Sequence, residues 1–413
     1  MDKKKIKIGI NVSFLRKPNT GIGQVTINFL KHLKDMEANF KEKEINFILY
    51  AEKPYSQISD LNLPKNTTVR ILSPLWKRDD LIRKIWWEKY LLPQKVKKDK
   101  CNLFLSLYQC PTIFNKTKHF MVVHDIVPKL FSEYLNNSRK KLYWKLTEKA
   151  IKRASKIITV SEHTQKDLIQ RLNIAPEKII VNYIDVDPIY KKEVSLKKSQ
   201  EVLKKYNLKP GYLYNGGGLE ARKNTERLLK AYKLLLKKFL ISNFQFPNEL
   251  PRKATPWGRQ ATSYKLQVPL LVISGKLMPE LAPLITDAEK LVKDLGLQDK
   301  VKLLDFVPQK DLPALYKNAL VFIYPSLYEG FGLPILEAMN CGTPVIASDI
   351  SSLPEIGGKA ILHCNPKSIK DIAQKIEKIL SNDNLRNELS VKGKKQAKKF
   401  SWGKFTEKLT ENI

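Results

Sequence analysis

Two carboxylates frame a glycine-rich turn in the last third of the sequence. Glu329 stands directly before Gly330, and Glu337 follows eight positions later (337 − 329), in the first turn of a predicted short helix. An apolar run precedes this loop, so the pattern is that of a buried strand, a glycine loop and a helix N-terminus. Backbone N–H groups at such a turn bind anions, and the helix dipole favours the same charge. The turn could hold a diphosphate while the carboxylates accept hydrogen bonds from sugar hydroxyls. Acidic residues at an ordinary helix N-terminus are the alternative.

A second anion-binding pattern follows another predicted strand. Three glycines at 216–218 lead to Arg222 and Lys223, and Asn224 can cap the helix that begins after them. Two cations between a glycine turn and a helix N-terminus suit a polyphosphate, because the backbone and the side chains then both present donors to it. A solvated basic turn is the alternative, and the pattern favours the phosphate site.

The N-terminal half contributes two more candidates. Gly21 and Gly23 separate the first predicted strand from a helix, although a lone pair of glycines also fits a simple tight turn. His124 ends a predicted buried strand, and residues at the carboxyl end of a parallel strand face the ligand crevice. A histidine there can position a hydroxyl or accept its proton near neutral pH. A structural histidine is the alternative.

Length and composition set the class of protein. At 413 residues the chain suits two domains, and 43% hydrophobic residues support packed cores. No apolar stretch approaches the roughly 18 residues of a membrane span, and the start reads as a strand, not as a signal peptide. Four cysteines show neither metal-type spacing nor a disulfide framework, so a cytoplasmic protein is expected.

The charge balance is strongly basic. There are 74 Lys and Arg residues against 41 Asp and Glu, a formal net charge of +33. Such a surplus attracts nucleic acid, an anionic membrane face or charged nucleotides, but a generally lysine-rich composition explains it equally well. No nucleic-acid-binding module is recognisable, so no specific nucleic-acid partner is expected.

Two segments remain open. Residues 75–100 should be helical and carry aromatic residues among many cations, which fits an interfacial helix on an anionic membrane. The same stretch also fits a helix packed on a sheet through Ile82, Ile85, Trp86 and Lys89, and this reading is slightly favoured. Residues 239–267 show no period and read as a long loop or insertion.

The longest motif closely resembles the family 4 retaining glycosyltransferases. It runs from Glu329 to Val345 as E-G-F-G-L-P-x-L-E-A-M-x-x-G-x-P-V. The phrase G-x-L-E-x-R-K-N around Arg222 matches the same family, and H-D-x-x-P at His124 looks like its bacterial mannosyltransferases. The resemblance covers nearly the whole chain except 239–267. It implies an α/β protein of the GT-B type, with two Rossmann-like domains facing each other across a cleft. Their expected ranges are 1–190 and 191–399, and 400–413 should be a helix that crosses back to the first domain.

The resemblance also implies a function. The expected reaction is transfer of a hexose, with mannose favoured, from a nucleotide-diphosphate sugar to a glycan or lipid-linked acceptor, as in polysaccharide biosynthesis. The first domain should present the acceptor and the second should bind the donor. GDP-mannose is the favoured donor and a UDP-sugar is possible, with no further cofactor and no metal. Transfer should retain the anomeric configuration.

Residue roles follow from the same resemblance. Glu329 should hold the hydroxyls of the transferred sugar, Glu337 those of the ribose, and His124 should position the sugar or the acceptor. His124 and Glu329 are therefore the expected catalytic residues. Donor binding is expected at Gly21, Gly23, Arg222, Lys223, Val307, Gly330, Phe331, Gly332, Leu333 and Glu337.

Alternatives remain at this stage. A double displacement through Glu329 is possible in principle, although attack from the face of the leaving phosphate is preferred. A nucleotide-sugar epimerase and a non-enzymatic polyanion- or membrane-binding protein are the rival functions. The expected location is cytoplasmic, and the protein could be peripheral on the inner face of a membrane.

Overall fold

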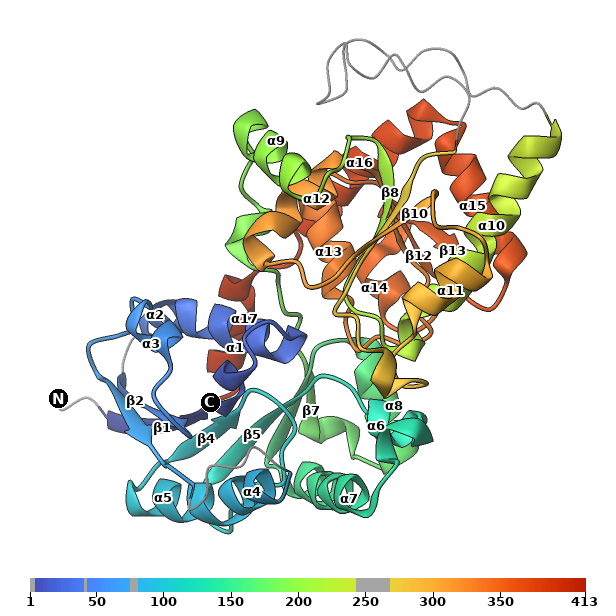
Figure 1. Ribbon diagram of the computed structural model, residues 1–413. Coiled ribbons are helices and arrows are strands. Elements are labelled where there is room, and N and C mark those ends of the chain that lie inside the picture. The colour runs from blue at the N-terminus through green and yellow to red at the C-terminus, as the bar shows by residue number, and fades with distance from the viewer. Residues whose placement is uncertain (1–3, 41–42, 75–80, 243–267) are drawn as a thin grey trace. The chain divides into compact units, whose positions relative to one another are not determined.

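The chain folds into two compact α/β units. The computed structural model describes residues 4–40, 43–74, 81–242 and 268–413, shown as ribbons in Figure 1. The first unit is made of Met1–Asp185 together with Phe400–Ile413, and the second of Val186–Lys399. Each unit has a parallel sheet with helices on both faces, as in Rossmann-like domains.

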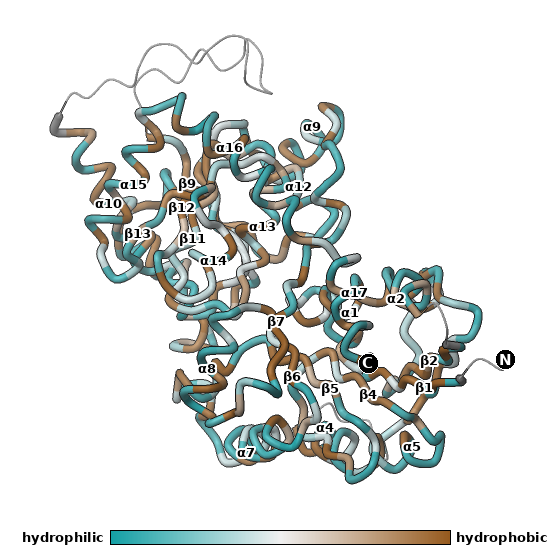
Figure 2. Tube along the Cα trace, turned by 180° about the vertical axis from the view of Figure 1, so that it is seen from behind, coloured by the Kyte–Doolittle hydropathy of each residue, from teal (hydrophilic) through white to brown (hydrophobic). Residues whose placement is uncertain are grey.

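Within the described residues, the first unit has a seven-stranded sheet in the order β3-β2-β1-β4-β5-β6-β7. Its strands pair in parallel throughout. The central strands are apolar and buried because helices cover both faces of the sheet. They appear brown in Figure 2, whereas the outer helix α7 is mostly teal. The strands are β1 (Lys4–Asn11), β2 (Lys43–Ala51), β3 (Thr67–Ile71), β4 (Leu103–Ser106), β5 (Lys118–Val123), β6 (Lys156–Thr159) and β7 (Ile179–Val181).

The helices of the first unit form two layers. Helices α1, α2 and α17 cover one face of the sheet, and α4, α5 and α7 cover the other (Figure 1). A π-helical turn, η2 (Trp87–Leu91), joins α4 to α5. The helices are α1 (Gly21–Lys31), α2 (Leu33–Asn39), α3 (Ser56–Ser59), α4 (Leu81–Trp86), α5 (Leu92–Lys98), α6 (Val127–Leu130), α7 (Ser138–Arg153), α8 (Glu162–Leu172) and α17 (Trp402–Glu411), with a 3-10 turn η1 (Ser13–Arg16) after β1.

The last helix, α17, belongs to the core of the first unit. The ring of Phe405 meets that of Phe29 at 6.1 Å, and Trp402 stacks on His32 with 6.2 Å between ring centroids. Asn182, which follows β7, donates a hydrogen bond of 2.9 Å to the carbonyl of Phe405. The C-terminal segment therefore completes a layer that the N-terminal helices begin.

In the second unit, the described residues form a six-stranded parallel sheet in the order β10-β9-β8-β11-β12-β13. Helix α10 packs on α15 and α11, while α13 packs on α16 and α12. The strands are β8 (Tyr212–Asn215), β9 (Leu271–Ser274), β10 (Val301–Leu304), β11 (Ala319–Tyr324), β12 (Val345–Ser348) and β13 (Leu362–Cys364). The helices are α9 (Leu196–Lys205), α10 (Thr225–Ser242), α11 (Ala288–Asp294), α12 (Leu312–Asn318), α13 (Leu333–Asn340), α14 (Leu353–Gly357), α15 (Ile369–Leu380) and α16 (Asp383–Ala397).

A 3-10 turn at Pro279–Leu281 precedes helix α11 and is separate from it, because Pro283 cannot continue a helix. Two expectations from the sequence differ from the structure. Residues 239–242 continue α10 instead of opening a loop, and 243–267 lie outside the described residues, as do 75–80. The face of the 81–90 helix is also different. Ile82 and Trp86 are exposed, whereas Trp87 is fully buried.

Candidate functional site

Each sheet has one point where the strand order reverses. In the first unit β1 lies between β2 and β4, and in the second β8 lies between β9 and β11. Connections leave these points toward opposite sides, so loops at the carboxyl ends of the strands part there and leave room for a ligand. The residues predicted from the sequence follow strands at these edges: Gly21 and Gly23 after β1, His124 after β5, Arg222 and Lys223 after β8, Val307 after β10, and Glu329 to Leu333 after β11.

In the second unit, the loops after β8 and β11 touch each other through glycines. Gly217 has φ +95°, and a Cβ there would lie 2.8 Å from Cγ of Pro334, in the first turn of α13. Gly332 has φ +105°, and a Cβ there would lie 2.6 Å from Cδ2 of Leu353. Only glycine adopts these angles without strain and leaves room for the neighbours. The two predicted phosphate-binding loops are therefore parts of one surface.

Glu329 is the centre of this surface. Its Oε1 lies 2.8 Å from Nζ of Lys223 and 3.1 Å from a guanidinium nitrogen of Arg222. Tyr324 and Ser326 donate hydroxyl hydrogen bonds of 2.9 and 2.6 Å to the same oxygen. Burial alone would raise the pKa of Glu329, but the two cations and these hydrogen bonds lower it to about 2. In the sequence, the two cations and the carboxylate belong to separate motifs. In the structure, they form one cluster.

The other half of this cluster is open to a ligand. Among the described residues, the hydrogen bonds and ion pairs of the Glu329 carboxylate all fall on Oε1, and none falls on Oε2. At the start of α13, the backbone N–H groups of Gly332 and Leu333 also lack a partner among the described residues. One free carboxylate oxygen beside two free amides can bind hydroxyls and an anion together. Gly330 and Phe331, which connect them, are buried.

Glu337 has a different environment from Glu329. It lies in the second turn of α13, and the prediction that placed it in the first turn is wrong. Burial raises its pKa to about 7, although hydrogen bonds from Tyr316 and Tyr190 act in the opposite direction. The Tyr316 hydroxyl lies 2.8 Å from Oε2 of Glu337. This carboxyl group therefore titrates near neutral pH, which Glu329 does not.

Asn224 fixes the loop that carries the two cations. It has left-handed backbone angles with φ +66°, and its side-chain amide donates to the carbonyls of Pro325 and Pro366 at 2.8 and 2.7 Å. Its Oδ1 accepts a hydrogen bond from Arg227, not from a helix N–H, so the predicted helix cap is wrong. Asn224 thus connects three segments and holds Lys223 against Glu329. Lys223 is only 5% exposed.

Val307 lies at the same edge of the sheet, in the loop after β10. It is buried, and the Phe306 ring beside it is 48% exposed. Asp305 accepts a hydrogen bond of 2.9 Å from the backbone N–H of Leu277, which joins the loops after β9 and β10. The part of Val307 in reading a nucleobase stays a prediction.

In the first unit, His124 is held in one tautomer. Its Nε2 lies 2.8 Å from the carbonyl of Leu107, and a carbonyl only accepts, so this nitrogen carries the proton. Burial lowers the pKa of His124 and so favours the neutral ring, although the bond to the Leu107 carbonyl acts in the opposite direction. Nδ1 is then an acceptor, and none of the described residues donates to it. The ring can therefore accept a hydrogen bond from a ligand hydroxyl.

The glycine turn after β1 is a tight helix start. Thr20 caps α1 by accepting a hydrogen bond of 3.2 Å from the N–H of Gly23. A Cβ on Gly23 would lie 2.0 Å from the carbonyl oxygen of Lys17, so no other residue fits. Gly21 has open space around it, and in the described chain its N–H and that of Ile22 have no partner. The turn exposes two donors, as an anion-binding turn does.

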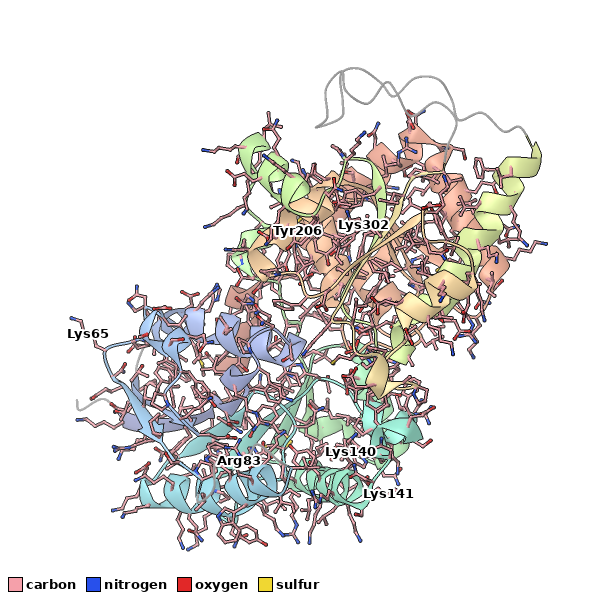
Figure 3. All side chains as sticks on the ribbon, viewed as in Figure 1. Lys65, Arg83, Lys140, Lys141, Tyr206 and Lys302 are labelled. Carbon is pink, nitrogen blue, oxygen red and sulfur yellow. The ribbon has the colours of Figure 1, made fainter. Side chains whose placement is uncertain are left out.

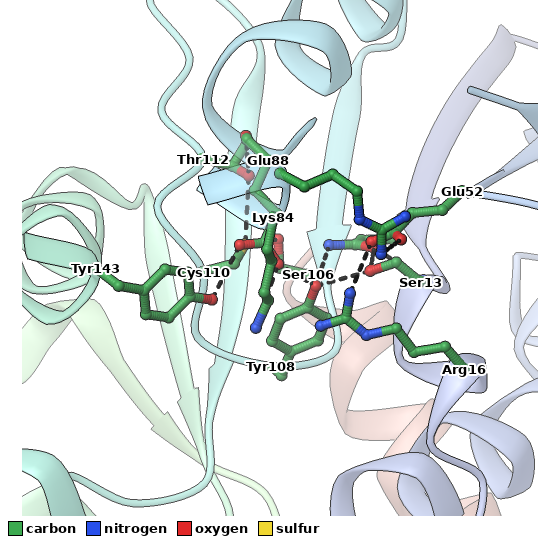
Figure 4. A network of polar contacts seen from close by, with 12 residues as sticks. Ser13, Arg16, Glu52, Lys84, Glu88, Ser106, Tyr108, Cys110, Thr112 and Tyr143 are labelled. Carbon is green, nitrogen blue, oxygen red and sulfur yellow. Dashed lines mark hydrogen bonds and ion pairs between the residues drawn. The ribbon is translucent and has the colours of Figure 1, made fainter. Parts of the chain in front are cut away.

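Several polar residues of these sites had not been found in the sequence. Tyr324 and Ser326 flank Pro325 at the end of β11, a position that could have been read as the ligand edge of a strand. Tyr316, on α12, belongs to no sequence motif that would have marked it as a site residue. In the first unit, Lys84, Glu88, Tyr108 and Tyr143 form a buried polar network, drawn in Figure 4.

Comparisons with known proteins bear on the family and the fold of this chain. The model of "Glycosyltransferase Family 4" matches residues 21–188, and that of "Glycosyl transferases group 1" matches residues 198–396. The O-antigen chain mannosyltransferase B of Escherichia coli is 34% identical over 281 residues, which are 68% of this chain and 65% of that protein. The O-antigen chain mannosyltransferase RfbU of Salmonella typhimurium is 27% identical over 378 residues, 90% of each chain.

A solved structure shows the same fold over the full length. WaaG, a glycosyltransferase involved in lipopolysaccharide biosynthesis, superimposes with a TM-score of 0.69 at 16% identity, covering 99% of both chains. The chain therefore belongs to the family 4 glycosyltransferases and has their two domains and GT-B fold. The family and fold class expected from the sequence are confirmed.

Proposed function

We propose that this protein is a retaining mannosyltransferase that uses a nucleotide-diphosphate mannose. The observation that carries the proposal is the cluster of Arg222, Lys223 and Glu329 beside the free amides of Gly332 and Leu333. Cations and amides suit the diphosphate, and the free oxygen of Glu329 suits a sugar hydroxyl. The names of the relatives support mannose and O-antigen-type glycans as the substrate class.

The proposed chemistry is electrostatic. As the glycosidic bond breaks, negative charge grows on the leaving diphosphate, and Arg222, Lys223 and the amides of α13 stabilise it. Because two fixed cations supply this charge, the reaction proceeds without a metal. The leaving phosphate helps to deprotonate the acceptor on the same face, and the Nδ1 of neutral His124 positions a hydroxyl. Glu337 holds the ribose hydroxyls, and the loop of Val307 contacts the base.

GDP-mannose is the proposed donor, with UDP-sugars as the competitors to test. A panel of nucleotide-sugars is assayed by thermal shift and by slow hydrolysis, with and without EDTA. One donor should raise the melting temperature and release its nucleotide equally well in EDTA. An absence of both effects with folded protein, or a loss of hydrolysis in EDTA, would contradict the proposal. The anomeric configuration of the released or transferred sugar is read by NMR before it mutarotates, and inversion would contradict retention.

A pair of variants tests the site itself. Arg222→Gln combined with Lys223→Gln should abolish donor stabilisation and hydrolysis, because both cations of the diphosphate site are lost. Lys230→Gln is the matched control, since Lys230 is a surface cation of α10 paired with Glu226. If the double variant hydrolyses the donor as the wild type does, the site is assigned wrongly.

A peripheral association with an anionic membrane is also proposed, on one observation. Ile82, Trp86 and Tyr90 are 47%, 37% and 41% exposed and recur every four residues along one helical face. Lys89 lies over the Tyr90 ring, so a cation accompanies the aromatic stripe. Other cations, such as Lys140 and Lys141, lie at the outer surface of the same unit (Figure 3). In the part of the chain that the structure describes, no helix is long and apolar enough to span a bilayer.

Vesicle sedimentation tests this association. The wild type should bind vesicles containing phosphatidylglycerol and should not bind neutral phosphatidylcholine vesicles. Trp86→Ser with Tyr90→Ser should lower the bound fraction severalfold, whereas Leu142→Ser, another exposed apolar residue of the first unit, should not. Equal binding of all three proteins would show that the stripe is not the contact.

A further inference from the structure

A buried polar network occupies the point of the first unit where the strand order reverses (Figure 4). Its centre is Glu88, which is fully buried in the π-helical turn Trp87–Leu91. Tyr108, which follows β4, donates to its Oε1, and Tyr143 of α7 donates to its Oε2 at 2.9 Å. Thr112 donates to its backbone carbonyl at 2.7 Å. π-Helical turns are rare and often mark functional sites. This one is held by hydrogen bonds from two separate parts of the chain.

Lys84 lies one turn before Glu88 and is enclosed by aromatic rings. Its Nζ is 4.6 Å from the ring centre of Tyr143, 5.3 Å from that of Tyr108 and 5.4 Å from that of Phe14. The nearest carboxylate oxygen, of Glu88, is 3.7 Å away, beyond hydrogen-bond distance. No described residue accepts a hydrogen bond from this ammonium group, and its side chain is 13% exposed. An aromatic cage satisfies the charge, but it leaves the N–H donors without acceptors.

Two arginines extend the positive charge beside Lys84. Arg16, from the turn after β1, and Arg83, from α4, both contact Glu52, at 3.1 and 2.8 Å. Three cations, Arg16, Arg83 and Lys84, thus stand against two carboxylates, Glu52 and Glu88, which leaves a surplus of one positive charge. Each of the three side chains is between 11% and 13% exposed, so each is largely enclosed but still reaches the surface. Guanidinium and ammonium groups in such proximity suit the oxygens of a phosphate.

We propose that Lys84, with Arg16 and Arg83, binds a phosphate or diphosphate group at the switch point of the first unit. The inference rests on the proposed function in one respect, namely that this group belongs to the acceptor. Glu88 is a positioning residue, because its contacts hold the tyrosine rings that enclose Lys84. The same chemistry occurs in a phosphate carried by a glycan and in the diphosphate of a lipid-linked sugar, and the test separates the two.

The test is isothermal titration of the full-length protein, with GDP at a saturating concentration to occupy the second unit. The titrants are inorganic pyrophosphate, mannose 1-phosphate and farnesyl diphosphate. Wild-type protein should bind pyrophosphate under these conditions, and Lys84→Met should weaken this binding tenfold or more. Lys84→Arg should stay within about threefold, because it keeps the charge. Farnesyl diphosphate binding at least tenfold tighter than pyrophosphate identifies a lipid-linked group, and similar or tighter binding of mannose 1-phosphate identifies a glycan phosphate.

Lys89→Met is the matched control for Lys84→Met. Lys89 lies on the adjoining helical turn and also faces a tyrosine ring, at 5.0 Å, but on the exposed side, so its loss should change binding less than twofold. Should Lys84→Met fail to fold, as judged by its thermal melt, Arg16→Gln replaces it and should weaken binding about fivefold. Unchanged binding in the folded variant, or no pyrophosphate binding by GDP-saturated wild type, overturns the inference.

A failure of the proposed function has a different signature. If no nucleotide or nucleotide-sugar binds, the titration is repeated without GDP on Arg222→Gln combined with Lys223→Gln, which lacks the second site. Pyrophosphate binding that this variant keeps and Lys84→Met loses still supports an anion site in the first unit. Binding that follows Arg222 and Lys223 instead places the anion in the second unit and overturns the inference.

Discussion

The two units surround their buried charged side chains differently at the point where the strand order of each sheet reverses. In the second unit, glycines at 217 and 332 clear space around a carboxylate that two cations keep charged, with the pKa of Glu329 near 2. In the first unit, aromatic rings fill the space around Lys84 and Glu88, and burial raises the pKa of Glu88 although Lys84 opposes this. The second site is therefore open and presents backbone amides together with charged side chains, whereas the first is filled by aromatic rings and presents charged side chains alone.

The two sites therefore depend on different features of the surrounding structure. The second site offers open backbone donors at glycine turns, so its binding of an anion depends on backbone conformation. The first site depends on side-chain packing, because its ammonium group is held by rings and not by hydrogen bonds. Substitutions of glycines should act mainly on the second site, and those that change a ring or a hydroxyl should act mainly on the first.

The largest effect is expected where a buried charge loses its partner. Lys223→Met leaves Glu329 with Arg222 alone and removes a donor to the diphosphate, so donor hydrolysis should fall about 10³-fold. The free energy of unfolding should also fall by about 3 kcal/mol, as when one partner of a buried ion pair is removed. Initial rates and urea denaturation measure the two effects. A loss below tenfold in rate would show that the cluster is structural only.

The second largest effect is expected from a substitution that changes the backbone conformation of the second site. Gly332→Ala forces a side chain into a positive-φ position whose Cβ would lie 2.6 Å from Leu353, so it should lower stability by about 2 kcal/mol and weaken donor binding about 100-fold. Gly296→Ala is the control, because Gly296 also has positive φ, +66°, but open space around it. It should lower stability by about 1 kcal/mol without affecting the donor. Equal effects of the two substitutions would contradict the role of close approach.

A pH profile separates the two carboxylates of the second unit. The pKa of Glu337 is about 7 and that of Glu329 about 2, so only Glu337 changes its charge between pH 5 and 8. A ribose hydroxyl donates to the charged form, and GDP-mannose affinity should therefore fall as the pH falls, by up to tenfold per unit below about pH 7. GDP-mannose has no phosphate proton to lose in this range. Glu337→Gln should flatten the profile, and an unchanged slope in this variant would exclude Glu337 as the titrating group.

The smallest effect is expected from a single hydroxyl in the first unit. Tyr143→Phe removes the hydrogen bond to Oε2 of Glu88 but keeps the ring over Lys84, so stability should fall by about 1 kcal/mol. Tyr143→Leu also removes the ring and should weaken pyrophosphate binding to the GDP-saturated protein severalfold. Thermal melts and the same titration measure both. A leucine variant that binds like the phenylalanine variant would show that the ring does not hold Lys84 in place.

Much of this fold could be predicted from the sequence. Strands buried on both faces are continuous apolar runs, as in β4, β5 and β11, and the glycine motifs follow them directly. The two glycine loops follow β8 and β11 as expected, because each is a short contiguous string in the sequence. The contact between the two loops could not be predicted from the sequence. Lys223 and Glu329 are 106 residues apart and meet only when β8 pairs with β11.

The errors have physical causes. Helical periodicity put Ile82 and Trp86 on the packed face, but the π-helical turn adds a residue and brings Trp87 and Glu88 to the interior. Asparagine is a common N-cap residue, but the side-chain amide of Asn224 donates to loop carbonyls instead. The network around Lys84 was not predicted, because its members come from segments far apart in the chain and each looks ordinary alone.

The position of α17 has a consequence for the order in which the protein is made. The first unit consists of residues before and after the second, so the second is in effect inserted into it. A ribosome therefore releases all of the second unit before the residues of α17, including Phe405 and Trp402, are available to cover Phe29 and His32. The apolar faces of α1 and α2 stay uncovered during this interval. The second unit can fold on the nascent chain, whereas the first unit must wait for its own last helix.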